Sequence, residues 1–237
     1  MIDSEFNEHM ITVNDNKIYF WTDITAHTCK ILLDYILKIE QRYDRIISTY
    51  HTTIKKLPQI ELYINSDGGT VIDAFVIIDH ILSSKYKFES IIQGNAASAA
   101  TMISIVCDHR KIYKNAFMMI HEMSAGVSGR YSFMRDDMKC NDKVMKMIKK
   151  LYLDHTKLDE KSLEMLLLKD IYWKADECLF MGLVDEIIEN VKIKKKTKNK
   201  IKLTRKMINK CKITKKNKII SLTKRIKKLD VKQWLYK

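Results

Sequence analysis

The sequence is poor in the two residues that most often interrupt helices and strands. Its 237 residues include six glycines and one proline, whereas average usage of roughly 7% Gly and 5% Pro would give about 17 and about 12. This scarcity excludes collagen-like, glycine/serine-linker and proline-rich disordered proteins. In such a background each glycine is expected to serve a backbone geometry, and the six are Gly68, Gly69, Gly94, Gly126, Gly129 and Gly182.

Long apolar runs and paired cysteines are also lacking. No apolar run approaches 18 residues, so no membrane span is expected. Residues 1–5 show neither the basic nor the apolar region of a signal peptide. The five cysteines are scattered without a C-x-x-C pair, which argues against a zinc site and a disulfide framework. We therefore expect reduced thiols, a cytoplasmic location and no metal.

Charge divides the chain into two parts. The formal net charge is +14, but residues 191–237 hold 20 Lys and Arg against the single acid Asp230, a net of +19, which leaves −5 for the rest. We therefore expect a globular domain over 1–190 and a Lys-rich tail over 191–237, partly disordered or helical. The tail is either a solvated extension or a segment that binds nucleic acid or another polyanion.

Strand-like and helix-like segments alternate along residues 17–188, which predicts an α/β fold. Residues 43–58 are polar and end at the only proline, so they are expected to form a surface loop or a frayed helix end. Strands are predicted at 17–21, 60–64, 88–92, 111–113, 117–120 and 183–188, and helices at 25–42, 70–83, from about 99 to 107, 131–155, 160–168 and 175–181 with Gly182 as the C-cap.

Two glycine turns, at 68–69 and at 94, each stand between a predicted strand and a predicted helix. Such turns present free backbone N–H groups that can hold a phosphate or an oxyanion. Ser98 follows the second turn, His121 ends a predicted strand, and Asp170 follows a predicted helix. Taken alone, these residues would be an N-cap, a structural histidine and a turn residue. Together they form a candidate Ser–His–Asp constellation.

Four motifs make the sequence resemble the ClpP family, the proteolytic subunits of Clp-type self-compartmentalised serine proteases. YINSDGG (63–69) resembles the family's YINSPGG turn, and GNAASAA (94–100) resembles its G-Q-A-A-S-M-A nucleophile turn. MMIHE (118–122) resembles its M-I-H-Q-P strand end, and residues 169–188 resemble its D-R-D…G-L-V-D segment. The four occur in the family's order over roughly residues 17–190.

The resemblance implies a ClpP/crotonase-like β-α superhelical core with a protruding handle helix at 131–155. It implies Ser98 as nucleophile, His121 as general base and Asp170 as the residue that orients the imidazole. The backbone N–H groups of Gly69 and Ala99 would form the oxyanion hole. Gly126 and Gly129 would belong to a substrate-binding strand, and the handle would join two stacked rings. No cofactor is implied, and the substrate would be a peptide or an unfolded protein.

Several features depart from the family pattern. Asp67 replaces its proline, and Glu122 and Met123 replace Gln-Pro after the histidine. A carboxylate near the base could raise its pKa or change which peptides are accepted. The family implies an AAA+ unfoldase as partner, but residues 1–16 do not match its docking segment, and residues 43–58 exceed its corresponding connection.

Three alternatives to a ClpP-type endopeptidase remain open at this point. The first is a catalytically silent ring subunit, and the second is a crotonase-like acyl-CoA enzyme, which also uses backbone oxyanion donors. The third is a maturation protease that its basic tail recruits to a nucleic-acid-containing assembly. The joint presence of Ser98, His121 and Asp170 favours the endopeptidase.

Overall fold

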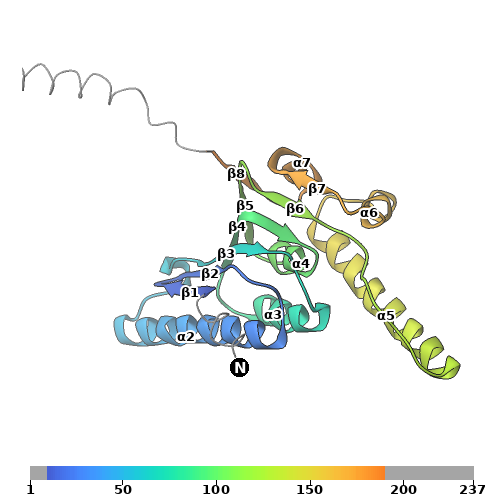
Figure 1. Ribbon diagram of the computed structural model, residues 1–237. Coiled ribbons are helices and arrows are strands. Elements are labelled where there is room, and N and C mark those ends of the chain that lie inside the picture. Colours follow the sequence, from blue (N-terminus) through green and yellow to red (C-terminus); the bar gives the residue numbers. More distant parts are fainter. Residues whose placement is uncertain (1–9, 190–237) are drawn as a thin grey trace, which may run out of the picture. The chain divides into compact units, whose positions relative to one another are not determined.

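A computed structural model describes residues 10–189 of the chain (Figure 1). The mixed α/β fold that the sequence predicts is confirmed. Eight strands form one sheet in the order β1-β2-β3-β4-β5-β8, and β6 joins β4 to β7. The strands are β1 (Ile11–Asn14), β2 (Lys17–Phe20), β3 (Ile60–Ser66), β4 (Phe88–Ala97), β5 (His109–Tyr113), β6 (Phe117–Met119), β7 (Tyr172–Lys174) and β8 (Glu186–Ile188).

Six α-helices and a 3-10 turn accompany this sheet within the described residues. They are α2 (Ala26–Tyr50), α3 (Val71–Ser83), α4 (Ala99–Ile105), α5 (Tyr131–His155), α6 (Glu160–Leu167) and α7 (Ala175–Met181), with the 3-10 turn at Ile54–Lys56. Most neighbouring strands are parallel, and β3 is buried at Ile60, Leu62 and Ile64. In residues 10–189 no helix is long and apolar enough to cross a membrane.

Strand β4 is longer than the sequence predicted. It does not end at Ile92 but continues to Ala97. Its first half pairs with β3 and β5, and Asn95–Ala97 pair with β6. The register of the β3–β4 pair shifts between Ile64 and Ser66. This shift allows β4 to continue as a strand through the turn predicted at Gly94. As a result, β4 carries the backbone directly to Ser98.

Helix α2 also corrects the sequence prediction. The predicted helix ended at residue 42, but α2 continues to Tyr50. The apolar spacing persists past the predicted end, since Tyr43 is 2% exposed and Ile46 and Ile47 pack against the core. Neither glycine nor proline interrupts the chain before Pro58. Residues 43–50, predicted as a surface loop or a frayed helix end, are therefore a regular part of α2 with an apolar stripe.

Helix α5 has the predicted bounds and extends away from the sheet (Figure 1). Its only buried residues are Ile148 and Tyr152, both in its second half. In its first half Tyr131, Phe133 and Met138 are more than half exposed. The first half of α5 therefore projects from the core, as expected for a handle helix.

The last described segment contains one strand that the sequence did not predict. Between α6 and α7, β7 pairs antiparallel with β6. Gly182 ends α7 in the left-handed region at φ 72°, which confirms it as the C-cap. The strand predicted at 183–188 is shorter and begins at Glu186. The predicted tail, 191–237, lies outside the described residues.

Candidate active site

Ser98 stands at the junction of β4 and α4 in a strained backbone conformation. Its φ of 52° and ψ of −126° are unusual for a residue with a side chain. It occupies the N-cap position of α4, yet its side chain makes no capping hydrogen bond. Instead its Oγ lies 2.8 Å from His121 Nε2. The Ser98 N–H donates to the Met119 carbonyl at 2.8 Å, which fixes the turn against β6.

His121 follows β6 by two residues, after the fully buried Ile120. Its side chain is 22% exposed, and its Nδ1 lies 3.1 Å from Asp170 Oδ1. The two ring nitrogens thus contact a hydroxyl on one side and a carboxylate on the other. This is the arrangement that a general base and its orienting acid require.

The unpredicted strand β7 explains how Asp170 reaches His121. In the β6–β7 pair Met119 lies opposite Tyr172 and Met118 lies opposite Trp173. Continuing this antiparallel register by two residues beyond Met119 places His121 opposite Asp170. The segment is also fixed by the Glu122 N–H, which donates to the Leu167 carbonyl at 2.8 Å.

The first glycine turn packs directly against the serine turn. Gly68 and Gly69 have φ values of 98° and 142°. A Cβ on Gly68 would lie 2.6 Å from the Ala97 carbonyl oxygen and 2.8 Å from Ser98 Cβ. Only glycine therefore fits at this position without displacing the turn at Ser98.

Two backbone N–H groups at this contact have no acceptor within their own bridge or helix. The Ile24 N–H donates to the Gly68 carbonyl at 2.7 Å, and the Thr70 N–H donates to the Ile24 carbonyl at 2.9 Å. In a parallel bridge of this kind the N–H of the intervening residue, Gly69, points away from the partner strand. Ala99 is the first residue of α4, so its N–H has no acceptor within the helix.

Thr101 and Tyr152 hold the backbone at Ser98 in place, and no sequence motif marks either residue. Thr101 Oγ1 donates to the Ser98 carbonyl at 2.6 Å and lies 2.5 Å from the hydroxyl of Tyr152. Tyr152 is 1% exposed, and burial raises the pKa of its hydroxyl. A tyrosine within an apolar helical stripe was a visible signal, but no sequence pattern joins it to a threonine 51 positions away.

Asp67, which replaces the proline of the family's first glycine turn, contacts the second glycine turn through Asn95. Its Oδ1 accepts a hydrogen bond from Asn95 Nδ2 at 2.7 Å. Asn65 Oδ1 accepts from the Asn95 N–H at 3.1 Å, and a Cβ on Gly94 would lie 2.7 Å from that same oxygen. Asn65, Asp67 and Asn95 thus join the end of β3 to β4 near Ser98. Aspartate in place of the family's proline therefore adds a hydrogen bond between the two glycine turns.

The segment with Gly126 and Gly129 forms neither helix nor strand in this chain. Gly129 has a φ of 137°, and a Cβ there would lie 3.3 Å from the Phe133 ring. Gly126 has no such φ, and a Cβ there would meet nothing within 4 Å. The expectation that every glycine serves a backbone geometry is therefore wrong for Gly126 in the single chain.

Three of the four cysteines in residues 10–189 are poor rival nucleophiles. Cys29, Cys107 and Cys178 are free and buried, and desolvation raises the pKa of each thiol to about 12. Such thiols are not ionised near neutral pH. The described part of the chain also holds no cluster of His, Cys, Asp and Glu that could bind a metal.

The molecule is therefore an α/β protein in which a serine, a histidine and an aspartate form one hydrogen-bonded chain beside two glycine-dependent turns. This is the arrangement typical of serine hydrolases. The family model described as Clp protease matches residues 24–191, which is more than half of the chain. The chain belongs to the Clp protease family, a family of oligomeric peptidases that act on proteins, and Ser98, His121 and Asp170 lie within the match.

Proposed function

We propose that the protein is a serine endopeptidase with Ser98 as nucleophile, His121 as general base and Asp170 as the orienting carboxylate. The observation that carries the proposal is the chain of two contacts, 2.8 Å from Ser98 Oγ to His121 Nε2 and 3.1 Å from His121 Nδ1 to Asp170 Oδ1. Family membership supports the same chemistry.

The reaction has two steps. Ser98 Oγ attacks the peptide carbonyl while its proton passes to His121 Nε2, and the Asp170 carboxylate stabilises the imidazolium. His121 then gives the proton to the leaving amine, and the C–N bond breaks to leave an acyl-enzyme. Water, deprotonated by the same imidazole, releases the acid and restores the Ser98 hydroxyl. No metal or redox partner takes part.

The N–H groups of Gly69 and Ala99 would stabilise the oxyanion of each tetrahedral intermediate. Gly68 brings its turn into contact with Ser98, and a donor of this kind typically contributes about 10²–10³ in rate. A crotonase-like acyl-CoA reaction could use the same two donors but would not require the chain that runs from Ser98 through His121 to Asp170. The peptidase therefore accounts for more of the site.

Substrate would bind in extended form beside the segment with Gly126 and Gly129, inside a chamber made by a ring or by two stacked rings. Residues 121–130 form neither helix nor strand in the described part of the chain, which suits pairing with a peptide. Because backbone pairing is indifferent to side chains, we expect broad sequence preference. An AAA+ unfoldase as partner and polyanion binding by residues 191–237 stay as predictions.

The test is active-site labelling with a fluorophosphonate probe. We expect labelling of the wild-type protein and none of Ser98→Ala, with peptide hydrolysis falling by about 10³-fold or more. Ser83→Ala is the matched control, because Ser83 is an exposed serine at the end of α3, outside the proposed site. Labelling that persists in Ser98→Ala would contradict the proposal, as would wild-type protein that is unlabelled in every oligomeric state.

One observation favours a second candidate, the catalytically silent ring subunit. The Asp170 side chain is 81% exposed, so water competes for its carboxylate and weakens its hold on His121. Equal peptide hydrolysis by wild-type protein and Ser98→Ala, measured in the assembled state, would favour this candidate over the endopeptidase.

A further inference from the structure

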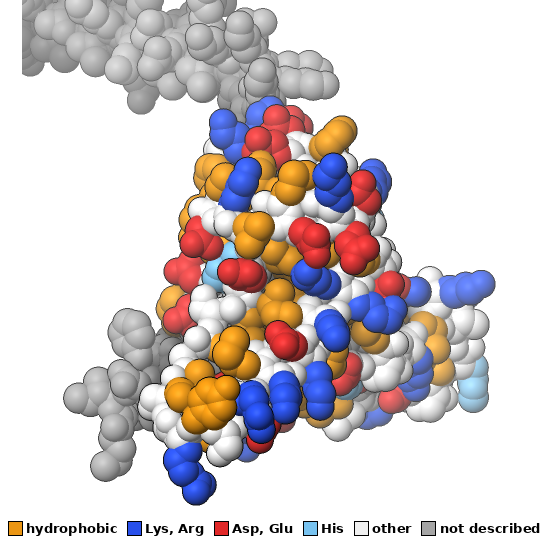
Figure 2. Space-filling view, turned by 90° about the vertical axis from the view of Figure 1, so that its right-hand side faces the viewer, with side chains coloured by type: hydrophobic (Ala, Val, Ile, Leu, Met, Phe, Trp, Pro, Cys, Tyr) orange, Lys and Arg blue, Asp and Glu red, His pale blue; other side chains and the backbone are white. Residues whose placement is uncertain are grey.

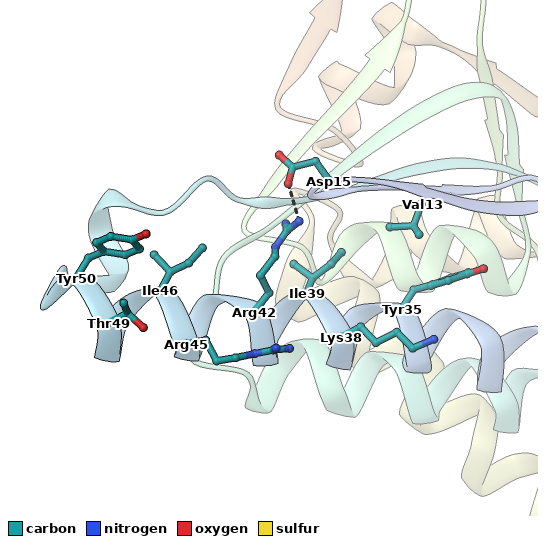
Figure 3. Close-up of a pocket in the computed structure, with 10 residues that line it drawn as sticks. All are labelled: Val13, Asp15, Tyr35, Lys38, Ile39, Arg42, Arg45, Ile46, Thr49 and Tyr50. Carbon is teal, nitrogen blue, oxygen red and sulfur yellow. Dashed lines mark ion pairs between the residues drawn. The ribbon is translucent and has the colours of Figure 1, made fainter.

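One groove in the described residues lies away from the candidate active site. It has a volume of about 740 Å³ and runs between α2 and the turn that follows β1 (Figure 3). None of Ser98, His121 and Asp170 lines it. A groove of this size on other elements is a separate feature of the molecule.

The groove combines apolar and cationic side chains. Val13, Ile39 and Ile46 contribute apolar surface, and the aromatic rings come from Tyr35 and Tyr50 (Figure 3). Of these residues, Val13 is 41% exposed and Tyr50 is 75% exposed. The groove therefore offers water-accessible apolar surface that an amphipathic partner could cover.

Three cations line the groove, and Asp15 is the one acid among its lining residues. Lys38, Arg42 and Arg45 follow one another at helical spacing along α2. Asp15 is paired with Arg42 at 2.6 Å. The net charge of the lining is thus positive, and Lys38 and Arg45 are exposed.

Two of the three acids of α2 lie on its other flank, and the third, Asp34, does not line the groove. On the other flank Glu40 contacts His80 and Ser84, and Asp44 contacts Lys85 and Tyr86. These acids are engaged by α3 and the residues that follow it, so they do not neutralise the groove. The cationic face results from this division.

The part of α2 that completes the groove is the part that the sequence did not predict as helix. Arg45, Ile46, Thr49 and Tyr50 all follow residue 42, where the helix was predicted to end. The additional helical length therefore adds both a cation and an exposed aromatic ring to this surface.

We propose that this groove, lined by α2 and the β1 turn, is a docking site for an acidic peptide segment of a partner protein in which acidic and apolar side chains alternate. Acids would pair with Lys38 and Arg45, while apolar side chains would cover Val13, Ile46 and Tyr50. The apolar surface favours such a peptide over a phosphate polyanion, which would leave it uncovered. The proposal does not depend on peptidase activity.

The test measures fluorescence anisotropy of a fluorescein-labelled peptide with alternating Glu and Leu, added to the full-length protein. We expect saturable binding that weakens with salt, and an affinity about tenfold lower for the double variant Lys38→Glu/Arg45→Glu. The double variant Lys143→Glu/Lys161→Glu is the matched control, because it makes the same charge change at exposed lysines on α5 and α6. We expect the control variant to lower the affinity for the peptide by less than about twofold.

A benzophenone group on the same peptide identifies the site. Cross-links to α2 and to residues 11–16 support the proposal, and cross-links confined to the Lys-rich residues 191–237 overturn it. Equal losses of affinity in the two double variants also overturn it. Binding that appears only after removal of residues 1–9 would assign the groove to the chain's own N-terminal segment. A fall in native mass in Lys38→Glu/Arg45→Glu alone would assign it to a second copy. Either outcome would overturn the proposal that the groove binds a peptide of a partner protein.

Discussion

At the scale of single residues, the site depends on the backbone of Ser98. Its positive φ directs the side chain away from the helix that it begins and toward His121. A residue in such a conformation costs about 1–3 kcal/mol and persists only where its surroundings enforce it. Here the enforcing contacts are the Met119 carbonyl, the Gly68 turn and Thr101.

The contact between Thr101 and Tyr152 gives a test of that support. Tyr152→Phe removes one buried hydrogen bond and leaves Thr101 able to donate to Ser98, so we expect a loss of about 1 kcal/mol in the free energy of unfolding. Thr101→Val leaves the Tyr152 hydroxyl buried without a partner, and we expect a loss of about 1–3 kcal/mol. Urea unfolding of both variants measures the difference, and the reverse order would contradict the assigned contacts.

The glycines give a second residue-scale prediction. An alanine at Gly68 would be strained at φ 98° and would lie 2.6 Å from the Ala97 carbonyl oxygen. We expect Gly68→Ala to lower the free energy of unfolding by roughly 2 kcal/mol and to abolish fluorophosphonate labelling. Gly126→Ala is the control, since its Cβ meets nothing within 4 Å, and we expect a change within about 0.5 kcal/mol. Stability and labelling of the two variants are measured together, and a Gly68→Ala protein as stable as Gly126→Ala would exclude the close turn contact.

At the scale of elements, β5 and β8 are joined by a forked ion pair. Arg110 Nε and Nη2 donate to the two carboxylate oxygens of Asp185 at 2.9 and 2.6 Å. The hydrogen bond from the Arg110 side chain holds the pKa of Asp185 below its usual value. A carboxyl whose pKa is lowered on folding stabilises the fold above its unfolded pKa of about 4, and the stabilisation is lost as pH falls through the folded pKa.

We therefore expect Asp185→Asn to lower the free energy of unfolding by about 1 kcal/mol at pH 7, and by progressively less as the pH falls below about 4. Urea unfolding of both proteins across this pH range measures it. Glu189→Gln is a suitable control, because its pair with Lys114 joins the same strands but is more exposed. A loss from Asp185→Asn that is equal at every pH would rule out the ion pair as its cause.

At the scale of the whole molecule, α5 leaves apolar side chains uncovered in the single chain. Phe133 and Met138 are 53% and 62% exposed. In Figure 2 apolar side chains lie beside lysines and arginines in the lower part of the face shown. Exposed apolar side chains on an otherwise charged helix are typical of an interface between subunits.

If α5 joins two rings, placing a carboxylate on it should separate them. Burying a Phe or Met side chain contributes about 1.5–3 kcal/mol, so we expect Phe133→Asp and Met138→Asp each to weaken assembly at least about tenfold. Native mass spectrometry measures the assembly, and circular dichroism checks that the subunit stays folded. Lys146→Asp, an exposed position on the same helix, should leave the native mass unchanged. An unchanged mass in all three variants would remove α5 from the interface.

The sequence by itself determined the order of most strands and helices, because apolar periodicity and glycine position are local properties of the chain. It also marked Ser98, His121 and Asp170, since each stands at the end of a recognisable element. Local patterns could not determine that β4 continues to Ala97 or that β7 pairs with β6, because strand pairing depends on partners distant in sequence. Only the tertiary structure decided that Asp170 lies opposite His121, that Thr101 meets Tyr152, and that the extended α2 forms a cationic groove with β1. Each of these is a contact between segments whose separation in sequence leaves no periodic signal.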